Sequence, residues 1–366
     1  MISYSNKVAE SGIELNNFPA SLCVNQSLAL TTIPLMISNM SPSKLIYSTI
    51  SSAVEVDLIN KTFTSHVLPS NLGVEGIDND NYFSWTASNI YKNGISVYSG
   101  FTGTVPAYSQ TAALPLKVFS PTNAIFITAT DNGSTTTMYV HTWNGISWTN
   151  STNLANIAQS STIDFCRICY KDSDTAYIVI GNNSDDKISV CKYIFSTNTL
   201  THIFTVSVSS IDILSGFVAF SDSSIYLITG DNASPLSLKL YNGSTFSVIS
   251  TEDIEDDYRY SGIEKKDDTT LYLFAYSGLI YEYDITTNTK TLIDNYSASY
   301  YSTSYIYLAT ITSSFVALRS MSSRGNCFVL AKRSVVTTDA VRYYFASGNP
   351  INDAIQNQTQ VNLKAR

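Results

Sequence analysis

Short apolar stretches separated by polar turns recur along most of the chain. The clearest unit, residues 268–294, contains three such stretches joined by turns at 277–278 and 286–289. The stretches are rich in aromatic and β-branched residues, and the turns are rich in Gly, Ser, Thr and Asn, which is typical of strands in antiparallel hairpins. One such unit cannot bury its own apolar face. We therefore expect it to pack against further copies of itself.

The unit recurs about every 45 residues. Equivalent apolar positions in the seven copies are Ile46, Phe83, Phe126, Ile178, Tyr226, Tyr272 and Val316. This period predicts an all-β fold, a seven-bladed β-propeller that forms a single closed ring of four-stranded antiparallel blades, because radial closure leaves few exposed strand edges. A β-solenoid would have a shorter period, and a pair of β-sandwiches would need a linker near the middle of the chain, where none is found.

Two kinds of turn also recur. Residues 193–203 align with residues 283–293 without a gap, at an offset of 90, so that Tyr and Asn positions coincide. Trp143–Trp148 and Tyr241–Phe246 share the pattern aromatic-Asn-Gly-x-x-aromatic. We interpret these Asn-Gly pairs as type I′ turns, in which both central residues have positive φ.

Several units resemble the blades of Kelch-type propellers, in which a run similar to I-Y-V-I-G-G precedes Y-D-x-x-T-N-x-W. Residues 177–182 and 225–230 resemble the first part, and residues 283–289 resemble the second. The resemblance covers most of residues 43–345, although the glycine doublet is absent and the closing tryptophan occurs only as Trp148. It implies the architecture and carries no activity.

The ends of the chain do not fit the repeat. We expect a propeller at residues 43–346, an N-terminal arm at 1–42 and a polar C-terminal tail at 347–366. The last unit shows three strands, and the apolar residues 27–38 offer a fourth. We therefore predict that the N-terminal strand pairs with the last unit and closes the ring.

Composition excludes two classes of partner. Charged residues make up only 14% of the chain, the net charge is −8, and no basic run is longer than Lys265-Lys266, which argues against binding of nucleic acid. The apolar residues 28–38 are too few to span a bilayer and are interrupted by Pro34. No segment resembles a signal peptide. We expect no insertion into a membrane.

The five cysteines and three histidines predict no catalytic, metal or cofactor site. Cys166 and Cys169 lie in an apolar, strand-like run, where residues three apart face opposite sides, so we expect buried free thiols. The remaining cysteines are scattered, as are His66, His141 and His202, for which we expect structural roles.

Acidic residues are densest at 252–257, which we interpret as a solvated loop. Calcium binding is an alternative there, although no D-x-D-x-D-G loop is present. Residues 78–81 are a second acidic stretch, more simply read as turn chemistry.

A tyrosine-rich segment is the candidate binding site. Five tyrosines occur within residues 296–307, more than one strand face can bury: Tyr296, Tyr300, Tyr301, Tyr305 and Tyr307. Tyrosine combines a large apolar body with a polar tip, so an exposed cluster suits contact with a protein or a sugar. The alternative is a strand with half of its tyrosines buried.

These features lead to a hypothesis about function. A rigid disc with polar arms and few charges is expected in a non-enzymatic structural protein of a virion, such as a phage tail or capsid-surface component, made in the host cytoplasm. Its partners would be other structural proteins of the assembly, and its loops would meet a receptor or surface glycan. The alternative is a secreted or cell-surface propeller that binds carbohydrate. A glycan-active enzyme with a pair of carboxylates is a more remote alternative.

Overall fold

The computed structural model describes most of the chain between residues 36 and 346, and leaves out 49–51, 58–61, 69–72, 107–113, 150–151, 158–162, 164, 183–185, 208–212, 231–236, 250–259, 276–278, 296–304, 312–314, 323–324 and 333–341. Within the described residues all regular elements are strands, and they form seven antiparallel sheets in chain order. Most of the predicted arm and the whole tail beyond residue 346 lie outside the described residues.

Each strand occupies one of four positions within its sheet. The first strands are β1 (Met36–Ser41), β5 (Gly73–Asp78), β9 (Leu116–Ser120), β14 (Phe165–Tyr170), β18 (Ile213–Ser221), β22 (Tyr260–Lys265) and β26 (Tyr305–Ile311). The second strands are β2 (Lys44–Ser48), β6 (Asn81–Trp85), β10 (Asn123–Asp131), β15 (Thr175–Asn182), β19 (Ser224–Gly230), β23 (Thr270–Ala275) and β27 (Phe315–Ser322).

The third strands are β3 (Ser52–Asp57), β7 (Asn89–Lys92), β11 (Thr136–Trp143), β16 (Lys187–Ile194), β20 (Ser237–Tyr241), β24 (Leu279–Asp284) and β28 (Gly325–Lys332). The outermost strands are β4 (Thr62–Val67), β8 (Ile95–Ser99), β12 (Trp148–Thr149) together with β13 (Asn153–Ile157), β17 (Thr199–Ser207), β21 (Phe246–Val248), β25 (Thr289–Asn295) and β29 (Arg342–Ala346).

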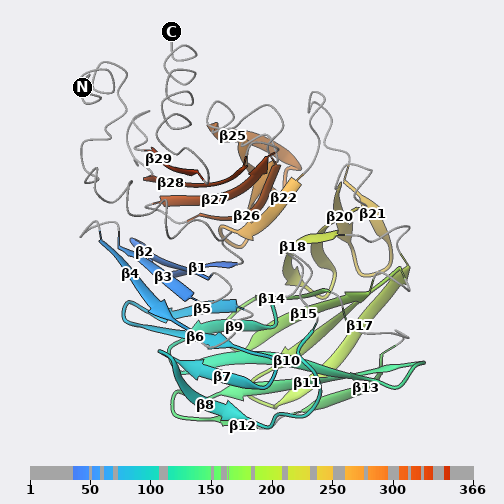
Figure 1. Cartoon of the computed structure of the whole chain (residues 1–366). Helices are drawn as coiled ribbons and strands as arrows, with labels where there is room; N and C mark the ends of the chain where they lie inside the picture. Colours follow the sequence, from blue (N-terminus) through green and yellow to red (C-terminus); the bar gives the residue numbers. More distant parts are fainter. Residues whose placement is uncertain are drawn as a thin grey trace, which may run out of the picture.

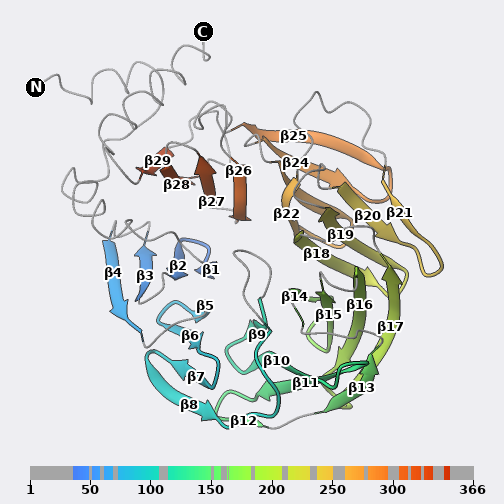
Figure 2. The same ribbon diagram turned by 45° about the vertical axis from the view of Figure 1, so that its right-hand side comes forward.

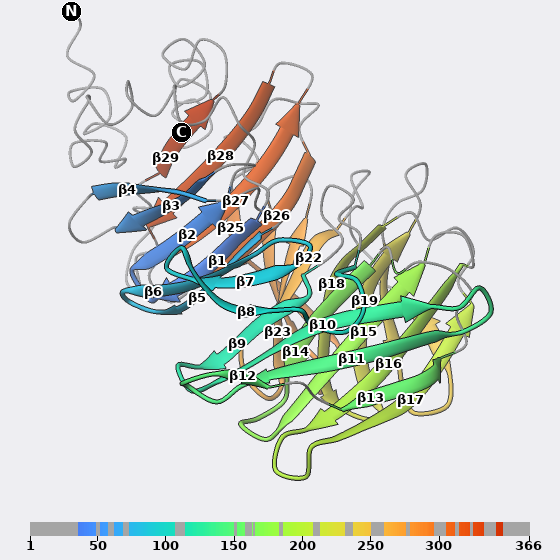
Figure 3. The ribbon, with the colours of Figure 1, turned by 60° about the horizontal axis from the view of Figure 1, so that its bottom comes forward.

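The sheets follow one another around a common centre, with their first strands on the inside (Figures 1 and 2). Each first strand contacts the first strand of the next sheet, from β1 and β5 onward to β22 and β26. Figure 3 shows the sheets β9–β13 and β14–β17 lying face to face. The chain is therefore an all-β propeller of four-stranded antiparallel sheets, as its sequence predicted.

The structure overturns the predicted pairing of the N-terminal strand. β1 pairs with β2, with Met36 opposite Ser48 and Ser38 opposite Ile46, so it belongs to the first sheet. The last sheet has four strands of its own, β26 to β29. The apolar markers found in the sequence all lie in second strands. The repeat seen in the sequence thus begins one strand too late, which makes the last unit look incomplete.

Apolar side chains fill the space between neighbouring sheets. Ile125, Met138, Ile178 and Cys191 belong to one cluster between the third and fourth sheets. Equivalent clusters lie between the first and second, second and third, fourth and fifth, and fifth and sixth sheets. The core is therefore divided into layers, each shared by two sheets.

Hairpins join the first strand to the second and the third to the fourth at the same end of each sheet, which we call the hairpin face. In the β16–β17 turn the hydroxyl of Tyr193 donates to Oδ1 of Asn198 at 2.8 Å, and Asn198 has a φ of 50°. In the β24–β25 turn Tyr283 donates to Asn288, whose φ is 56°. The alignment of these two segments in the sequence is thus matched by the same side-chain contact.

Neither of the two predicted type I′ turns is formed; an Asn-Gly pair with positive φ at both residues occurs instead between β7 and β8. Asn93 and Gly94 both have positive φ, 50° and 80°. In the Trp143–Trp148 turn only Gly145 does, and Asn144 instead accepts hydrogen bonds from the amides of residues 146 and 147, both at 2.9 Å. Asn242 is bonded in the same way. Four residues separate the paired strands at these two sites, so the Asn side chain closes the turn in place of a two-residue loop.

Glycine allows first strands to approach one another. A Cβ added to Gly76 of β5 would lie 2.4 Å from the carbonyl oxygen of Asn39 of β1. A Cβ on Gly216 of β18 would lie 2.3 Å from Cγ2 of Ile263 of β22. Both contacts join first strands of neighbouring sheets.

We predict that Gly76→Ala lowers the free energy of unfolding by about 2–3 kcal/mol, because the added methyl meets backbone that cannot move aside. Gly133→Ala is the control, since nothing lies within 4 Å of its Cβ and only its φ of 86° is strained, at about 1 kcal/mol. Denaturant unfolding of both variants checks this. Equal losses would contradict the proposed crowding.

Candidate functional site

A network of polar side chains joins the first strands of three successive sheets. Oε2 of Glu75 in β5 accepts a hydrogen bond from the hydroxyl of Ser38 in β1 at 2.8 Å. Its Oε1 accepts one from Nζ of Lys117 in β9 at 2.7 Å. The side chain of Glu75 is only 9% exposed, and that of Lys117 is 37% exposed. We call Ser38, Glu75 and Lys117 the inner network.

Charges from further sheets act on the same lysine. Burial alone would lower the pKa of Lys117, but the adjacent Glu75 carboxylate raises it above the ordinary value, with smaller contributions from Glu264 of β22 and Tyr170 of β14. Glu75, Lys117, Tyr170 and Glu264 belong to four different sheets. The inner side of the propeller therefore brings together groups that are far apart in the sequence.

Most hydrogen-bonding groups of the inner network already bond to one another, and only the ammonium group of Lys117 has donors left for a polar ligand. The amide of Gly76 donates to the hydroxyl of Ser38 at 3.0 Å, so this hydroxyl is both donor and acceptor. The ammonium group of Lys117 carries three N–H donors. Among the described residues, the carboxylate of Glu75 accepts a hydrogen bond from one of them. The remaining donors of this lysine and its partial exposure leave the ammonium group accessible to a ligand or to water.

An exposed aromatic residue lies near this network, at the end of β14. Tyr170 is 48% exposed. Its ring packs edge-on against Phe119 of β9, with centroids 5.5 Å apart. Lys265 of β22 donates to the carbonyl oxygen of the following residue, Lys171, at 3.3 Å. The ring is thus packed on one side and partly exposed to solvent, and the ammonium group of Lys265 lies beside the backbone of the next residue.

The described cysteines are free thiols, as predicted. Cys166 and Cys191 are buried in one apolar cluster, whereas Cys169 packs against the next cluster along the ring. Cys166 and Cys169 therefore face opposite sides of β14. Burial raises the pKa of the thiols of Cys169 and Cys191 to about 12. Cys23 lies outside the described residues, as does the side chain of Cys327.

The histidines lie in three different sheets. His141 is fully buried, and its ring nitrogens contact the hydroxyls of Tyr98 at 3.1 Å and Thr128 at 2.8 Å, which confirms a structural role. His66 lies 3.2 Å from Oε1 of Glu55, and His202 lies 2.9 Å from Thr205. In the described part of the chain no three His, Cys, Asp or Glu residues are grouped to hold a metal ion.

The acidic stretch at 78–81 forms a turn, as its simpler interpretation predicted. Oδ1 of Asp78 accepts hydrogen bonds from the amide of Asp80 at 2.9 Å and from Nδ2 of Asn81 at 2.7 Å. Residues 252–257 lie outside the described residues.

The structure does not describe the side chains of the predicted tyrosine site. Tyr296, Tyr300 and Tyr301 lie outside the described residues, and Tyr305 and Tyr307 fall in β26, of which only the backbone is described. Sequence reasoning missed Glu75, Lys117 and Tyr170, which lie on first strands. A glutamate between Gly73 and Gly76 in a short apolar run was the available signal. Among the described residues no helix is long and apolar enough to cross a membrane.

We predict that Lys117→Met lowers the free energy of unfolding by about 2 kcal/mol, because it leaves the buried Glu75 carboxylate without its counter-charge. The loss is below that of a fully buried pair because Lys117 is partly exposed. A double-mutant cycle with Glu75→Gln should give a coupling of about 1–2 kcal/mol. The more exposed pair Lys192–Asp222 is the control, with a coupling below about 1 kcal/mol. Equal couplings would contradict this.

We also predict that the thiols of Cys169 and Cys191 resist alkylation in the folded protein at pH 8. A pKa of about 12 leaves almost no thiolate at that pH. Iodoacetamide labelling followed by peptide mass spectrometry should show both cysteines unlabelled under native conditions and labelled in denaturant. Rapid native labelling of either one would show that it is accessible as thiolate.

Comparison with known proteins identifies a fold and no family. No protein-family model and no curated protein sequence matches the chain. A puromycin hydrolase mutant complexed with PGG is similar over 93% of this chain and 57% of that one, with a TM-score of 0.54 and 9% identity. Sqt1 from Saccharomyces cerevisiae is similar over 87% of this chain and 86% of its own, with a TM-score of 0.51 and 9% identity. The chain thus spans little more than half of the puromycin hydrolase structure. At such identities the similarity shows the propeller fold alone.

Proposed function

We propose that this protein is a non-catalytic structural protein of a virion, in a phage tail or on a capsid surface. In this proposal it assembles with other structural proteins along the outer edges of its sheets and presents the hairpin face to a partner or receptor. The proposal that the protein assembles with other proteins rests on a set of apolar side chains that are exposed on outermost strands. The low charge and tyrosine-rich composition support the virion part.

The exposed side chains are Val67 of β4, Ile95 of β8, Val248 of β21 and Leu292 of β25, with exposed fractions from 50% to 90%. Each of these strands pairs on one side only within the described residues. An unpaired strand edge offers backbone donors and acceptors to an added strand, and exposed β-branched residues favour such pairing. These edges are therefore suited to assembly with neighbouring proteins.

The proposal includes a single closed ring of seven blades with degenerate Kelch-like units. Contact of β1 with both β5 and β26 supports closure, since it joins the first sheet to the second and to the last. Such a ring closes by packing of complete sheets, without exchange of a strand. The polar segments 1–26 and 347–366 are proposed as assembly arms.

Ties between neighbouring sheets support a rigid hairpin face. Asp222, in the turn after β18, accepts hydrogen bonds from the hydroxyl of Tyr177 in β15 and from Nζ of Lys192 in β16, both at 2.5 Å. Lys44 of β2 donates to the carbonyl oxygen of Asn79, in the turn after β5, at 2.6 Å. In both cases the inner hairpin of one sheet is held by the preceding sheet. A surface built in this way can present a constant shape to a partner.

A carbohydrate-binding propeller at the cell surface or outside the cell is the second candidate function. The specific observation in its favour is Tyr170, which is 48% exposed and is followed by Lys171, whose carbonyl oxygen accepts a hydrogen bond from Lys265.

We predict that Val67→Lys together with Ile95→Lys reduces incorporation into the native particle by about tenfold or more, because charge on both edges opposes strand addition. The free energy of unfolding should change by less than about 0.5 kcal/mol, since both side chains are exposed. Quantitative incorporation of purified variants into particles that lack the wild-type protein checks this.

Ala87→Lys, at an exposed position in the turn between β6 and β7 and therefore off the outermost strands, is the control and should leave incorporation unchanged. Normal incorporation of the double variant would contradict assembly through the outer edges. A full-length chain that enters no particle and remains a monomer would contradict the structural role altogether.

A further inference from the structure

Tyr170 is unusual among the exposed apolar residues because it lies on a first strand. Among the other large apolar side chains described as exposed, Val67, Ile95, Val248 and Leu292 are on outermost strands, and Ile146 lies in the turn between β11 and β12. β14 contacts β9 on one side and β18 on the other, so the end of β14 is surrounded by ends of other first strands. A ligand at Tyr170 would therefore meet residues from several sheets at once.

The ring of Tyr170 is held in a fixed orientation. Phe119 meets it edge-on at 5.5 Å, and Phe119 is itself packed edge-on against Phe195 at 5.3 Å. Two aromatic contacts in series leave the tyrosine little freedom. A fixed aromatic face loses less entropy on binding than a mobile one.

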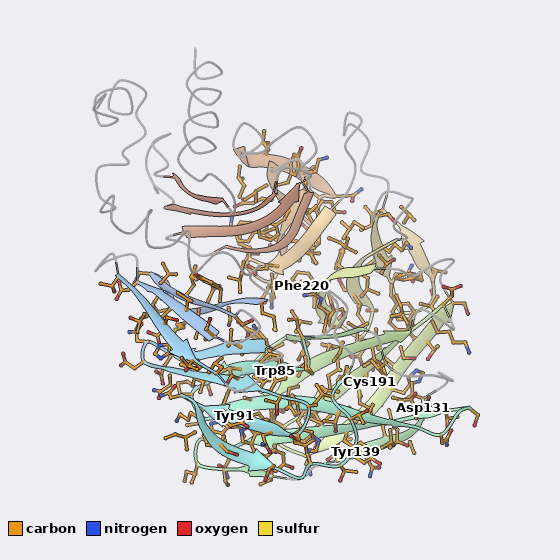
Figure 4. The ribbon with its side chains drawn as sticks, viewed as in Figure 1. Trp85, Tyr91, Asp131, Tyr139, Cys191 and Phe220 are labelled. Carbon is orange, nitrogen blue, oxygen red and sulfur yellow. The ribbon has the colours of Figure 1, made fainter. Side chains whose placement is uncertain are left out.

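Polar groups of both signs lie on the two residues that follow Tyr170 and on residues of and just after β22. The ammonium group of Lys171 lies 3.8 Å from Oδ2 of Asp172, and both side chains are about half exposed. Lys265 donates to Asp268 at 2.8 Å as well as to the carbonyl oxygen of Lys171. Its Nζ also lies 5.4 Å from the ring centroid of Phe220, a residue that is labelled in Figure 4. The chain that follows Tyr170 thus carries or contacts hydrogen-bond donors and acceptors from two lysines and two aspartates, whose charges balance.

We propose that Tyr170 is the stacking platform of a binding site for a neutral sugar. A pyranose ring has an apolar face that can cover the phenol, and hydroxyl groups around its edge that can bond to Lys171, Asp172 and Lys265. The balance of charge favours a neutral ligand over an anionic one, because an acid would meet Asp172 and Asp268 as well as the lysines. This site is independent of the outer edges proposed for assembly.

The test uses the full-length protein and three neutral disaccharides, lactose, maltose and N,N′-diacetylchitobiose, with sialyllactose as the anionic probe. Saturation-transfer NMR and calorimetric titration up to about 20 mM cover the millimolar affinities typical of small ligands. We expect at least one neutral disaccharide to bind. Tyr170→Ala should weaken that binding by about tenfold, and Tyr170→Phe, which keeps the ring, by less than about threefold.

Tyr139→Ala is the matched control, because Tyr139, labelled in Figure 4, is a partly exposed tyrosine of the third strand β11 and not of a first strand. It should change affinity by less than about twofold. The proposal is overturned if none of the neutral sugars binds, if sialyllactose alone binds, or if Tyr170→Ala and Tyr139→Ala have the same effect. Circular dichroism of each variant verifies that it is folded. None of these outcomes bears on incorporation into a particle, so the two proposals stand or fall separately.

Discussion

The close approach of first strands is the constraint on which this propeller depends. Sheets that surround a common centre must converge on the inside and diverge on the outside, so the space between them is wedge-shaped. Gly76 and Gly216 lie at the narrow side, where a Cβ would collide with the neighbouring sheet. Large rings fill the wide side, as where Phe204 stacks on Tyr241 with centroids 3.8 Å apart. A gradient of side-chain size from centre to edge thus sets the angle between sheets.

This constraint explains what the sequence could and could not predict. Second and third strands are continuous apolar runs, such as residues 271–274, and their spacing reveals the repeat. The first strands β1 and β5 contain small and polar residues, MISNMS at 36–41 and GVEGID at 73–78. Such residues resemble turns when judged by propensity. The repeat seen in the sequence therefore lacks its first strand, and the wrong scheme for ring closure follows from that omission.

The candidate sites were harder to predict, because their residues come from different sheets and meet only where first strands are neighbours in the folded protein. Glu75 and Lys117 lie 42 residues apart and meet only because β5 and β9 are neighbouring first strands. No motif has that spacing. In the sequence, Tyr170 does not stand out beside the closely spaced tyrosines at 296–307. Close spacing can be read from a sequence, whereas the solvent exposure of one tyrosine on a first strand cannot. The thiols were predictable because a strand separates residues three apart onto opposite faces, which is a local rule.

The carboxylates of the hairpin face have a consequence for the protein's response to acid. Hydrogen bonds from the Thr269 amide hold the pKa of Asp267 below its usual range, and those from Thr286 do so for Asp284. A carboxyl group whose pKa is lowered in the folded protein stabilises the fold at pH values above its ordinary pKa. This stability is lost as the pH falls through the lowered pKa. Both residues cap hairpins at the same end of the sheet β22–β25. Any contact that depends on the shape of these hairpins therefore inherits a sensitivity to protons.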